Sequence, residues 1–361
     1  MKLNKENILQ LLQQININES TTISDSDFVH SIKIEDTCIH LDIATSNPSL
    51  QFKNKIKTQV ENLLLGEYPS VTINLNFIVP KEKSNIPTSN IKNVIAVASG
   101  KGGVGKSTIS SNLAIGLKKA GYTVGIIDAD IYGPSIPLMF DAEQARPKLV
   151  DNTNKSLMDP VVSYGIKIMS IGFFTKMNEA VVWRGPMATK ALNQIINETN
   201  WGDLDYLLID LPPGTSDIHL TLVQTMSITG ALIVTTPQPV AIIDARKAIK
   251  MFKMKQINVP VLGLVENMSW CLIDDKKHYL FGRDGGKNLS QSEEISLLAE
   301  LPLDQSIREA GDVGRPAALQ ETDLGKLFKK LALDVVDAIN SRNQILPKTK
   351  KVEIKHNRGC N

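Results

Sequence analysis

The chain has 361 residues, of which 42% are hydrophobic and 22% charged, and its formal net charge is +2. This composition is typical of a globular protein long enough for two domains, and the charge gives no support to a nucleic-acid partner. No apolar run approaches the roughly 20 residues of a membrane span, and the N-terminus lacks the apolar core of a signal peptide. The three cysteines, Cys38, Cys271 and Cys360, are too scattered for a disulfide framework. We therefore expect a cytoplasmic protein without nucleic-acid or membrane partners.

Residues 1–80 have the pattern of a small α/β domain. Apolar residues recur at helical spacing, or alternate with polar residues as half-buried strands require. Helices are predicted over 6–14 and 52–65, and strands over 28–34, 38–44 and 71–79. Residues 81–90 are polar and contain a proline, so they are predicted to be a linker.

From residue 91 to residue 345, strand and helix patterns alternate. This order is typical of a mostly parallel sheet with helices on both faces. Strands are predicted over 93–98, 122–127, 165–171, 205–210, 231–236 and 261–265, and helices over 109–121, 188–199, 241–252 and 324–339. The last segment, 346–361, carries five lysines and arginines and is predicted to be a flexible basic tail.

A glycine-rich loop separates the first of these strands from the first helix. Residues 99–108 read Ser-Gly-Lys-Gly-Gly-Val-Gly-Lys-Ser-Thr and contain the spacing Gly-x-x-x-x-Gly-Lys-Ser. Backbone N–H groups of such a loop surround a phosphate chain, and its glycines allow close approach of the backbone. We therefore predict a P-loop that binds ATP through Gly100, Lys101, Gly102, Gly103, Val104, Gly105, Lys106, Ser107 and Thr108.

The side chains of this P-loop have separate predicted roles. Lys106 is expected to reach the terminal phosphates and Ser107 to ligate Mg²⁺, while Thr108 opens a helix whose N-terminus favours anions. Asp210 ends an apolar strand and precedes Leu-Pro-Pro-Gly-Thr-Ser. A carboxylate at that place is expected to hold the hydration shell of Mg²⁺ beside Ser107, so the chain has the parts of a P-loop NTPase.

Lys101 gives the loop a second cation, although phosphate binding within one subunit needs only Lys106. The loop resembles the deviant Walker A motif of the SIMIBI class of NTPases, which includes partition ATPases, septum-site ATPases, the nitrogenase iron protein and Mrp-type iron–sulfur carriers. In that class, this lysine crosses a dimer interface to the nucleotide of the partner subunit. The resemblance therefore implies a nucleotide-sandwich homodimer in which Lys101 is catalytic. The alternative for Lys101 is a solvated charge.

The same resemblance implies roles for three other residues. Asp130, in a switch I region, would orient or activate the attacking water, with Asp128 supporting it. Asn267, in Glu-Asn-Met-Ser, would hydrogen-bond the purine, because an amide offers adenine both a donor and an acceptor. Pro239, in Pro-Gln-Pro-Val-Ala, would flank the base. The alternatives are a structural cap for Asp130 and a turn residue for Asn267.

Four further stretches narrow the resemblance to one family. They are Asp-Ala-Asp-Ile-Tyr-Gly-Pro-Ser-Ile-Pro over 128–137, Trp-Arg-Gly-Pro-Met over 183–187, Asp-Leu-Pro-Pro-Gly-Thr-Ser-Asp over 210–217 and Glu-Asn-Met-Ser over 266–269. Residues 91–340 resemble the Mrp/ApbC-type iron–sulfur cluster carrier ATPases, and the pattern of 1–80 is similar to a small domain of these ATPases and of iron–sulfur assembly factors. The family implies slow, dimer-dependent ATP hydrolysis. It also implies a [4Fe–4S] cluster held between two subunits, with apoprotein clients and assembly factors as partners.

The cysteines depart from the family pattern. A Cys-x-x-Cys pair is usual a few residues after Asn-Met-Ser, but its expected places, near Ile273 and Lys276, hold no cysteine. Four thiolates ordinarily hold a [4Fe–4S] cluster, and Cys271 supplies only two per homodimer. Cys360 would raise that number to four. The alternatives are an apolar filler for Cys271, a non-ligand tail residue for Cys360 and a surface residue for His278.

Two other functions are compatible with the same motifs. A spatial-organising ATPase of the partition or septum type would explain the basic tail and the missing Cys pair, but it explains neither the N-terminal domain nor the stretch over 183–187. A septum-type tail also needs an apolar stripe, which 348–358 lacks. The third function is a scaffold that keeps the nucleotide fold and delivers another metal or a protein client without a cluster.

Overall fold

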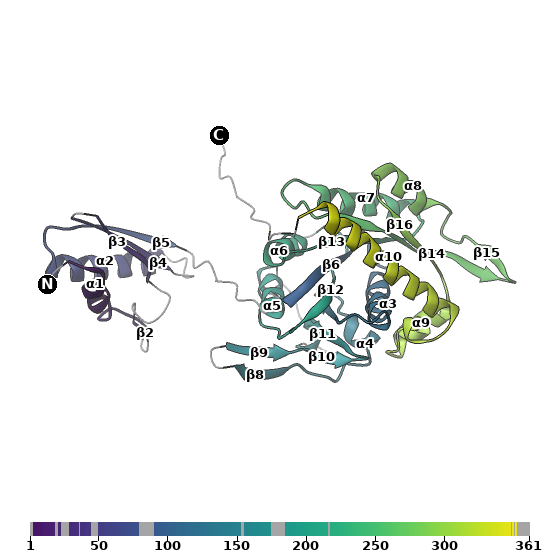
Figure 1. The fold of residues 1–361 in the computed structure, drawn as a ribbon, viewed down its shortest axis with the longest axis horizontal. Coiled ribbons are helices and arrows are strands. Elements are labelled where there is room, and N and C mark those ends of the chain that lie inside the picture. Colours follow the sequence, from purple (N-terminus) through teal and green to yellow (C-terminus); the bar gives the residue numbers. More distant parts are fainter. Residues whose placement is uncertain are drawn as a thin grey trace. The chain divides into compact units, whose positions relative to one another are not determined.

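Two structural units follow one another along the chain (Figure 1). They comprise Met1–Ser84 and Asn85–Asn361. The computed structural model describes residues 3–18, 21–22, 29–35, 37–44, 50–78, 90–152, 155–174, 185–215, 217–347, 349 and 351. Within these ranges, no helix combines the length and the hydrophobicity that crossing a bilayer requires.

The first unit is a three-stranded sheet with two helices packed against it. Its elements are α1 (Lys5–Leu12), a short pair β1 (Asn16–Asn18) and β2 (Thr21–Thr22), β3 (Val29–Glu35), β4 (Cys38–Ala44), α2 (Leu50–Glu67) and β5 (Thr72–Ile78). The central strand β4 is antiparallel to β3 and parallel to β5. Its buried residues, Ile39, Leu41 and Ile43, belong to one core with Ile56 and Val60 of α2. The predicted alternation therefore places one face of the sheet against the helices.

The second unit is built on a nine-stranded sheet. The strands lie in the order β10-β11-β7-β12-β6-β13-β14-β15, and β16 also pairs with β14. Their bounds are β6 Ile91–Ser99, β7 Val124–Asp128, β10 Val161–Ser163, β11 Ile166–Ser170, β12 Leu204–Asp210, β13 Gly230–Thr235, β14 Val261–Ile273, β15 Lys276–His278 and β16 Leu297–Pro302. Only the pairs β10–β11 and β14–β15 are antiparallel. The inner strands are buried along nearly their whole length, which explains their continuous apolar sequences.

Helices cover both faces of this sheet, as the sequence predicts (Figure 1). They are α3 (Lys106–Lys119), α4 (Ile136–Met139), α5 (Gly185–Asn197), α6 (Asp217–Thr225), α7 (Pro239–Lys253), α8 (Gly285–Glu293), α9 (Gln305–Asp312) and α10 (Asp323–Ile345). The connection through α3 leads from β6 toward β7, whereas those through α6, α7 and α8 lead the opposite way along the sheet. Because such crossovers are right-handed, α3 lies on one face with α10, and α6, α7 and α8 lie on the other. The direction of winding changes beside β6, and ligands of open α/β sheets bind at such a point.

One strand is longer than predicted, and several elements were not predicted. β14 continues past Val265 to Ile273, because the polar residues after Val265 are buried through hydrogen bonds instead of forming a turn. One of these bonds runs from the Ser269 hydroxyl to Glu266 Oε1 at 2.7 Å. The helices and strands without a prediction are β1 and β2 in the first unit and, in the second, β10, β15, β16, α4, α6, α8, α9 and a separate hairpin of β8 (Lys148–Asn152) and β9 (Lys155–Asp159).

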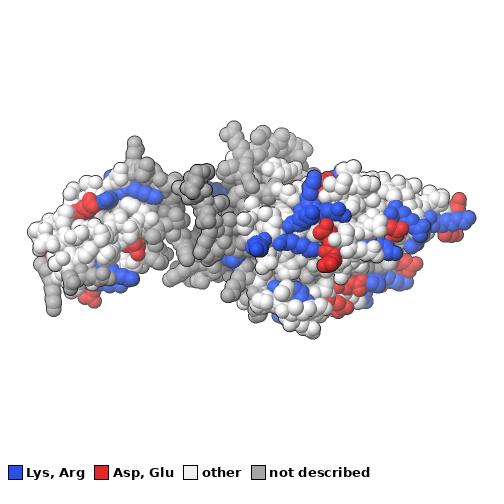
Figure 2. All heavy atoms as spheres, turned by 90° about the horizontal axis from the view of Figure 1, so that it is seen from above, with Lys and Arg blue, Asp and Glu red and all other residues white. Residues whose placement is uncertain are grey.

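Charged side chains of both signs share the surface of the second unit. On the face shown in Figure 2, lysine and arginine side chains lie beside acidic and uncharged ones. Some of these charges form ion pairs at the surface of helices α7 and α10, for example Lys247 with Asp244 at 3.0 Å and Lys330 with Asp334 at 2.6 Å. Such pairs contribute about 0–1 kcal/mol each, so the stability of this unit rests on its core.

Candidate nucleotide site

The glycine-rich loop turns sharply between β6 and α3. Gly103 and Gly105 have φ angles of +79° and +82°, in the left-handed region that glycine adopts most easily. A Cβ atom on Gly100 would lie 2.1 Å from the backbone carbonyl of Asp244 in α7, and one on Gly105 would lie 2.2 Å from Nδ2 of Asn267. The loop therefore needs glycine at these positions for its conformation and for its contacts with two neighbouring elements.

Helix α3 begins at Lys106, so the prediction that Thr108 opens the helix is wrong by two residues. The reason is that Gly105 already ends the loop: its carbonyl accepts a helical hydrogen bond from the Ile109 N–H at 3.0 Å. The side chains of Lys106 and Ser107 thus project from the first turn of α3. Unpaired backbone N–H groups of that turn favour a phosphate.

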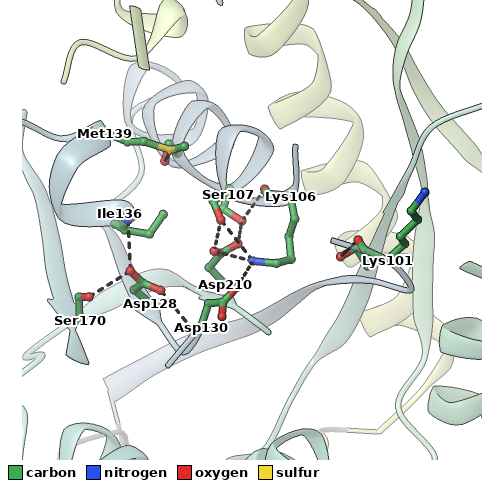
Figure 3. A network of polar contacts seen from close by, with 12 residues as sticks. Lys101, Lys106, Ser107, Asp128, Asp130, Ile136, Met139, Ser170 and Asp210 are labelled. Carbon is green, nitrogen blue, oxygen red and sulfur yellow. Dashed lines mark hydrogen bonds and ion pairs between the residues drawn. The ribbon is translucent and has the colours of Figure 1, made fainter. Parts of the chain in front are cut away.

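A compact polar cluster surrounds the Lys106 ammonium (Figure 3). Its Nζ lies 2.7 Å from Oδ2 of the fully buried Asp210, 3.9 Å from Oδ2 of Asp130 and 3.3 Å from Oγ of Ser107. The hydroxyl of Ser107 donates to Asp210 Oδ2 at 2.6 Å, and that of Ser110 donates to Asp210 Oδ1 at 2.5 Å. The structure therefore brings together four residues that the sequence predicts for the site, from the P-loop, β12 and the segment after β7. Ser110 was not predicted, although it lies three residues after Ser107 on the same helix face.

Asp128 lies beneath this cluster and is fully buried. Its Oδ2 accepts hydrogen bonds from the Ile136 N–H at 3.1 Å and the Ser170 hydroxyl at 3.0 Å, and its Oδ1 accepts one from the Asp130 N–H at 3.2 Å. Burial, together with the negative charge of Asp210, raises the pKa of Asp128 to about 7. Asp128 therefore fastens both ends of the segment 130–136 to the end of β7.

Opposing effects act on the pKa of Asp130, and the net result is a raised value. Burial raises the pKa of its carboxyl group, the positive charge of Lys106 lowers it, and the negative charge of Asp210 raises it again. Asp130 is the most exposed of the three aspartates, with 15% of its side chain accessible. A carboxylate with a raised pKa that still reaches solvent suits a group that holds a water molecule or a proton.

Asn267, the residue predicted to contact the purine, lies against the P-loop. Its side chain is 7% exposed, and Nδ2 donates to the Val104 carbonyl of the P-loop at 2.9 Å. The next residue, Met268, has a φ of +55°, so the strand is distorted directly after Asn267. Pro239 is the first residue of α7, where its fixed φ suits a helix start.

Lys101 does not join the cluster around Lys106. Its side chain is exposed and points away from Lys106 and Asp210 (Figure 3). The backbone around it is nonetheless fixed, because the Lys101 carbonyl accepts a hydrogen bond from the Ser99 hydroxyl at 3.0 Å. The loop thus presents this ammonium outward, beside the predicted phosphate site.

Cys271 lies in a hairpin that β14 and β15 form beyond Asn267. It is half-buried and directly opposite His278, and its Sγ lies 3.7 Å from the His278 carbonyl. Ile273 and Lys276, near the expected places of the Cys pair, face each other across a turn whose two residues, 274–275, have φ angles of 50° and 58°. These angles define a type I′ turn. Within the described part of the chain, no three His, Cys, Asp or Glu residues are arranged to hold a metal ion.

Several predicted features fall wholly or partly outside the described residues. They are the linker 81–90 except for its last residue, most of the basic tail 346–361 including Cys360, the first two residues of the stretch 183–187 and one residue of the stretch 210–217. The remaining cysteine, Cys38, belongs to β4 of the first unit, where Asn74 Nδ2 lies 3.2 Å from its sulfur.

Comparison with known proteins agrees with this geometry. A family model described as NUBPL iron-transfer P-loop NTPase matches residues 90–339. The chain belongs to this family of iron-transfer P-loop NTPases. A second model, described as iron–sulfur cluster assembly protein, matches residues 5–74, within the first unit. The predicted family and fold class are therefore confirmed.

Relatives of this family of NTPases share nearly half of their aligned residues with the chain. An iron–sulfur cluster carrier protein of Pseudomonas fragi is 46% identical over 284 residues, which cover 77% of this chain and 97% of the relative. The carrier protein of Escherichia coli K12 is also 46% identical, over 75% of this chain and 74% of its own. The iron–sulfur cluster transfer protein NUBPL of Mus musculus is 43% identical, over 73% and 82%.

Solved structures show the same fold. A nucleotide-binding protein of Archaeoglobus fulgidus, in complex with ADP, is 38% identical and superposes with a TM-score of 0.57 over 67% of this chain and 94% of its own. The cell division ATPase MinD of Pyrococcus furiosus is 23% identical, with a TM-score of 0.51 over 68% and 99%, and shows the fold alone.

The raised pKa of Asp128 predicts how stability changes with pH. In the unfolded chain this carboxyl group loses its proton near its ordinary value of 3.8, whereas the folded chain keeps the proton to about pH 7. The folded state binds more protons between these values, so the free energy of unfolding falls as the pH rises through this window. Asp128→Asn removes that loss. We expect the free energy of unfolding of the variant to exceed that of the wild type by about 1 kcal/mol at pH 4.5, and this difference should grow to about 4 kcal/mol at pH 7.5. Urea unfolding measures both values.

Asp205 provides the control for this measurement. A hydrogen bond from Lys92 is the main cause that lowers the pKa of Asp205 to about 2, so this group stays ionised in both states above pH 5. Asp205→Asn should therefore differ from the wild type by a constant amount above pH 5. An equal pH slope for the wild type and Asp128→Asn would contradict the placement of a protonated Asp128 under the site.

Proposed function

We propose that this chain is a cytoplasmic, ATP-hydrolysing carrier that binds an iron–sulfur cluster and transfers it to apoproteins, with assembly factors as further partners. The observation that carries the proposal is the convergence of Lys106, Ser107, Asp130 and Asp210 at the start of α3. The chain that carries these four residues belongs to a family of iron-transfer P-loop NTPases, and its relatives are named as iron–sulfur cluster carrier proteins.

Phosphate binding replaces the pair that Lys106 and Asp210 form with each other. The Lys106 ammonium lies at the first turn of α3 and is 6% exposed, so a phosphate at the loop competes with the Asp210 carboxylate for this ammonium. Backbone N–H groups of the loop and of this turn bind the remaining phosphate oxygens. When Lys106 turns to the phosphates, Asp210 is left with its two hydroxyl donors.

The residues around Asp210 fit Mg²⁺. The Ser107 hydroxyl and the Asp210 carboxylate are hard oxygen ligands and lie 2.6 Å apart, at the side of the P-loop where the terminal phosphates are proposed. Ser107 would hold the ion directly and Asp210 through its hydration shell. The bound ion would neutralise charge on the phosphates.

Asp130 acts on the attacking water. Its carboxylate lies 3.9 Å from the Lys106 ammonium and keeps contact with solvent, so a water molecule beside it also lies near the terminal phosphate that Lys106 binds. Asp128 fixes the Asp130 backbone through its hydrogen bond at 3.2 Å. Correct placement of the water supplies much of phosphoryl-transfer catalysis, so one well-held carboxylate suffices.

The base of ATP binds between Asn267 and Pro239. Asn267 contacts the P-loop through the Val104 carbonyl, and α7, which begins at Pro239, contacts the loop where Asp244 lies against Gly100. The Asn267 amide is a donor and an acceptor in reach of an adenine edge, and the Pro239 ring supplies an apolar surface.

The active species is a homodimer in which Lys101 serves the partner subunit. The loop holds its backbone firmly but directs its side chain away from the Lys106–Asp210 cluster. An exposed ammonium beside a phosphate site is available to a second triphosphate that faces the first. Hydrolysis by an isolated subunit is therefore slow, because each site lacks one cation until two subunits meet.

The cluster, which is the cargo of this ATPase, binds at the hairpin that carries Cys271. A two-fold axis doubles each ligand, so two copies of Cys271 supply half of a four-thiolate site. Cys360, a small thiol or the client protein supplies the rest. Ligands of this kind exchange readily, which suits a protein that must release what it carries. Ile273 and Lys276, which stand near the expected places of the usual Cys pair, flank the two-residue turn at 274–275.

Removal of either lysine tests the ATPase. Lys106→Ala should abolish tight ATP binding, because the buried ammonium is the phosphate ligand of the subunit's own site. Lys101→Ala should bind ATP within about threefold of the wild type and lose at least about tenfold in turnover, together with ATP-linked dimer formation. Turnover by phosphate release and mass by light scattering would be measured at equal protein concentration.

The control for these variants is Lys330→Ala, which removes an exposed lysine paired with Asp334 on α10. It should leave binding, turnover and dimer formation unchanged. Wild-type ATP affinity in Lys106→Ala would contradict the site. Equal turnover in Lys101→Ala and the wild type would contradict the proposed contact between subunits.

Replacement of the hairpin cysteine tests the cargo. After anaerobic reconstitution with iron and sulfide, the wild type should bind iron weakly and lose it in air. Cys271→Ser should bind none, because Cys271 is the cysteine of the hairpin, and Cys360→Ser should lose a smaller part. Iron and acid-labile sulfide per dimer are the measurements. Cys38→Ser, in the first unit, should retain wild-type iron. Retention of all iron by Cys271→Ser would exclude this hairpin as the binding place.

A further inference from the structure

Glu266 is a buried carboxylate that the proposed chemistry does not use. It directly precedes Asn267 on β14, and only 1% of it is exposed. Its Oε1 accepts a hydrogen bond from the Ser269 hydroxyl at 2.7 Å, and its Oε2 accepts one from the Gly286 N–H. Burial of a carboxylate destabilises the fold unless the group is hydrogen-bonded, and these two donors offset that cost for Glu266.

Through its contact with Gly286, Glu266 of β14 caps the first turn of helix α8. Helix α8 begins at Gly285, and the residue before it, Asp284, has a φ of +59° and makes no capping hydrogen bond with its side chain. The first N–H groups of a helix need acceptors, and a negative charge there is favourable. Glu266 supplies both from β14, and so fixes the place where α8 begins.

The start of α8 is in turn wedged against the loop that leads into α7. A Cβ atom on Gly285 would lie 2.5 Å from the Pro237 carbonyl oxygen, and one on Gly286 would lie 2.8 Å from Oε2 of Glu266. The backbone of α8 therefore fills the space between Pro237 and Glu266 with no room for a side chain. A shift of α8 would shift the segment that ends in Pro239.

We propose that Glu266 is a positioning residue for the purine of the bound nucleotide. By holding the start of α8 against Pro237, it sets the separation between Pro239 on one side of the base and Asn267 on the other. This inference rests on the proposed function, since it assumes that the base of ATP binds between these two residues. The contribution of Glu266 therefore appears in the recognition of adenine and not in the phosphate chemistry at Lys106.

The test compares ligands with and without the base. Glu266→Ala leaves the first turn of α8 without its acceptor and should raise KM for ATP about tenfold, with kcat changed by less than about twofold. Affinity for inorganic tripolyphosphate, which has no base, should stay within about twofold of the wild type. The preference for ATP over GTP should fall. Glu266→Gln keeps the shape and one acceptor, so it should give a smaller rise in KM, and it serves as the test variant if Glu266→Ala does not fold.

Asp304 offers a matched control, because it caps helix α9 by accepting a hydrogen bond from the Ser306 N–H at 2.8 Å. Asp304→Ala removes a capping carboxylate of the same kind from another helix, and should change neither KM nor purine preference. Wild-type KM and purine preference in both Glu266 variants, or equal effects of Asp304→Ala, would overturn the inference while the ATP site stands. A wild type that binds tripolyphosphate as tightly as ATP would overturn the base site as well.

Discussion

The structure depends on a buried ion pair between residues that are far apart in the sequence. The Lys106 ammonium and the Asp210 carboxylate lie 2.7 Å apart, and neither has much access to water. Removing one partner of such a pair strands a buried charge, at a cost of about 3–5 kcal/mol. Because Asp210 also accepts hydrogen bonds from Ser107 and Ser110, this pair fastens the end of β12 to the first turn of α3. The side chains of the proposed nucleotide site are therefore held together by their own contacts, and they offer opposite charges to which phosphate and Mg²⁺ can bind.

Strand β14 links the other functional parts. Along one continuous strand it carries Glu266 toward α8, Asn267 toward the P-loop and Cys271 into the hairpin. The proposed base site and the proposed cargo site thus lie on the same strand. The strand is distorted between them at Met268, whose φ is +55°. A nucleotide that bound the Asn267 amide, as proposed, would act on the same strand that holds Cys271.

Local patterns in the sequence predicted most of the fold. Continuous apolar runs identified the buried parallel strands, and the strand–loop–helix context identified the P-loop. Features that depend on distant partners could not be predicted. The extension of β14 is one, because Glu266 and Ser269 look like turn residues until Gly286 supplies a donor. The type I′ turn at 274–275 was missed for a local reason, since Asp-Asp is a weaker signal for it than Asn-Gly.

For the candidate site, too, the sequence predicted residue types from local motifs but not the contacts between residues that are far apart in the chain. The sequence predicted the types and roles of Lys106, Ser107 and Asp210, but not that Lys106 and Asp210 bind each other, since 104 positions separate them. It did not predict the fastening role of Ser170 on Asp128 either, because that bond joins two strands. The role of Lys101 depends on a second subunit, and no pattern within one chain shows where its ammonium binds.

The central claim is that phosphate and Mg²⁺ replace the Lys106–Asp210 pair. A crystal structure with Mg²⁺ and a non-hydrolysable ATP analogue tests it most directly. The account predicts that Lys106 Nζ leaves Asp210 and lies within hydrogen-bond distance of the phosphates, that Ser107 ligates the ion and that Asp210 lies beside its hydration shell. A nucleotide bound at the P-loop with the Lys106–Asp210 pair still 2.7 Å apart, or a nucleotide bound elsewhere, would contradict it.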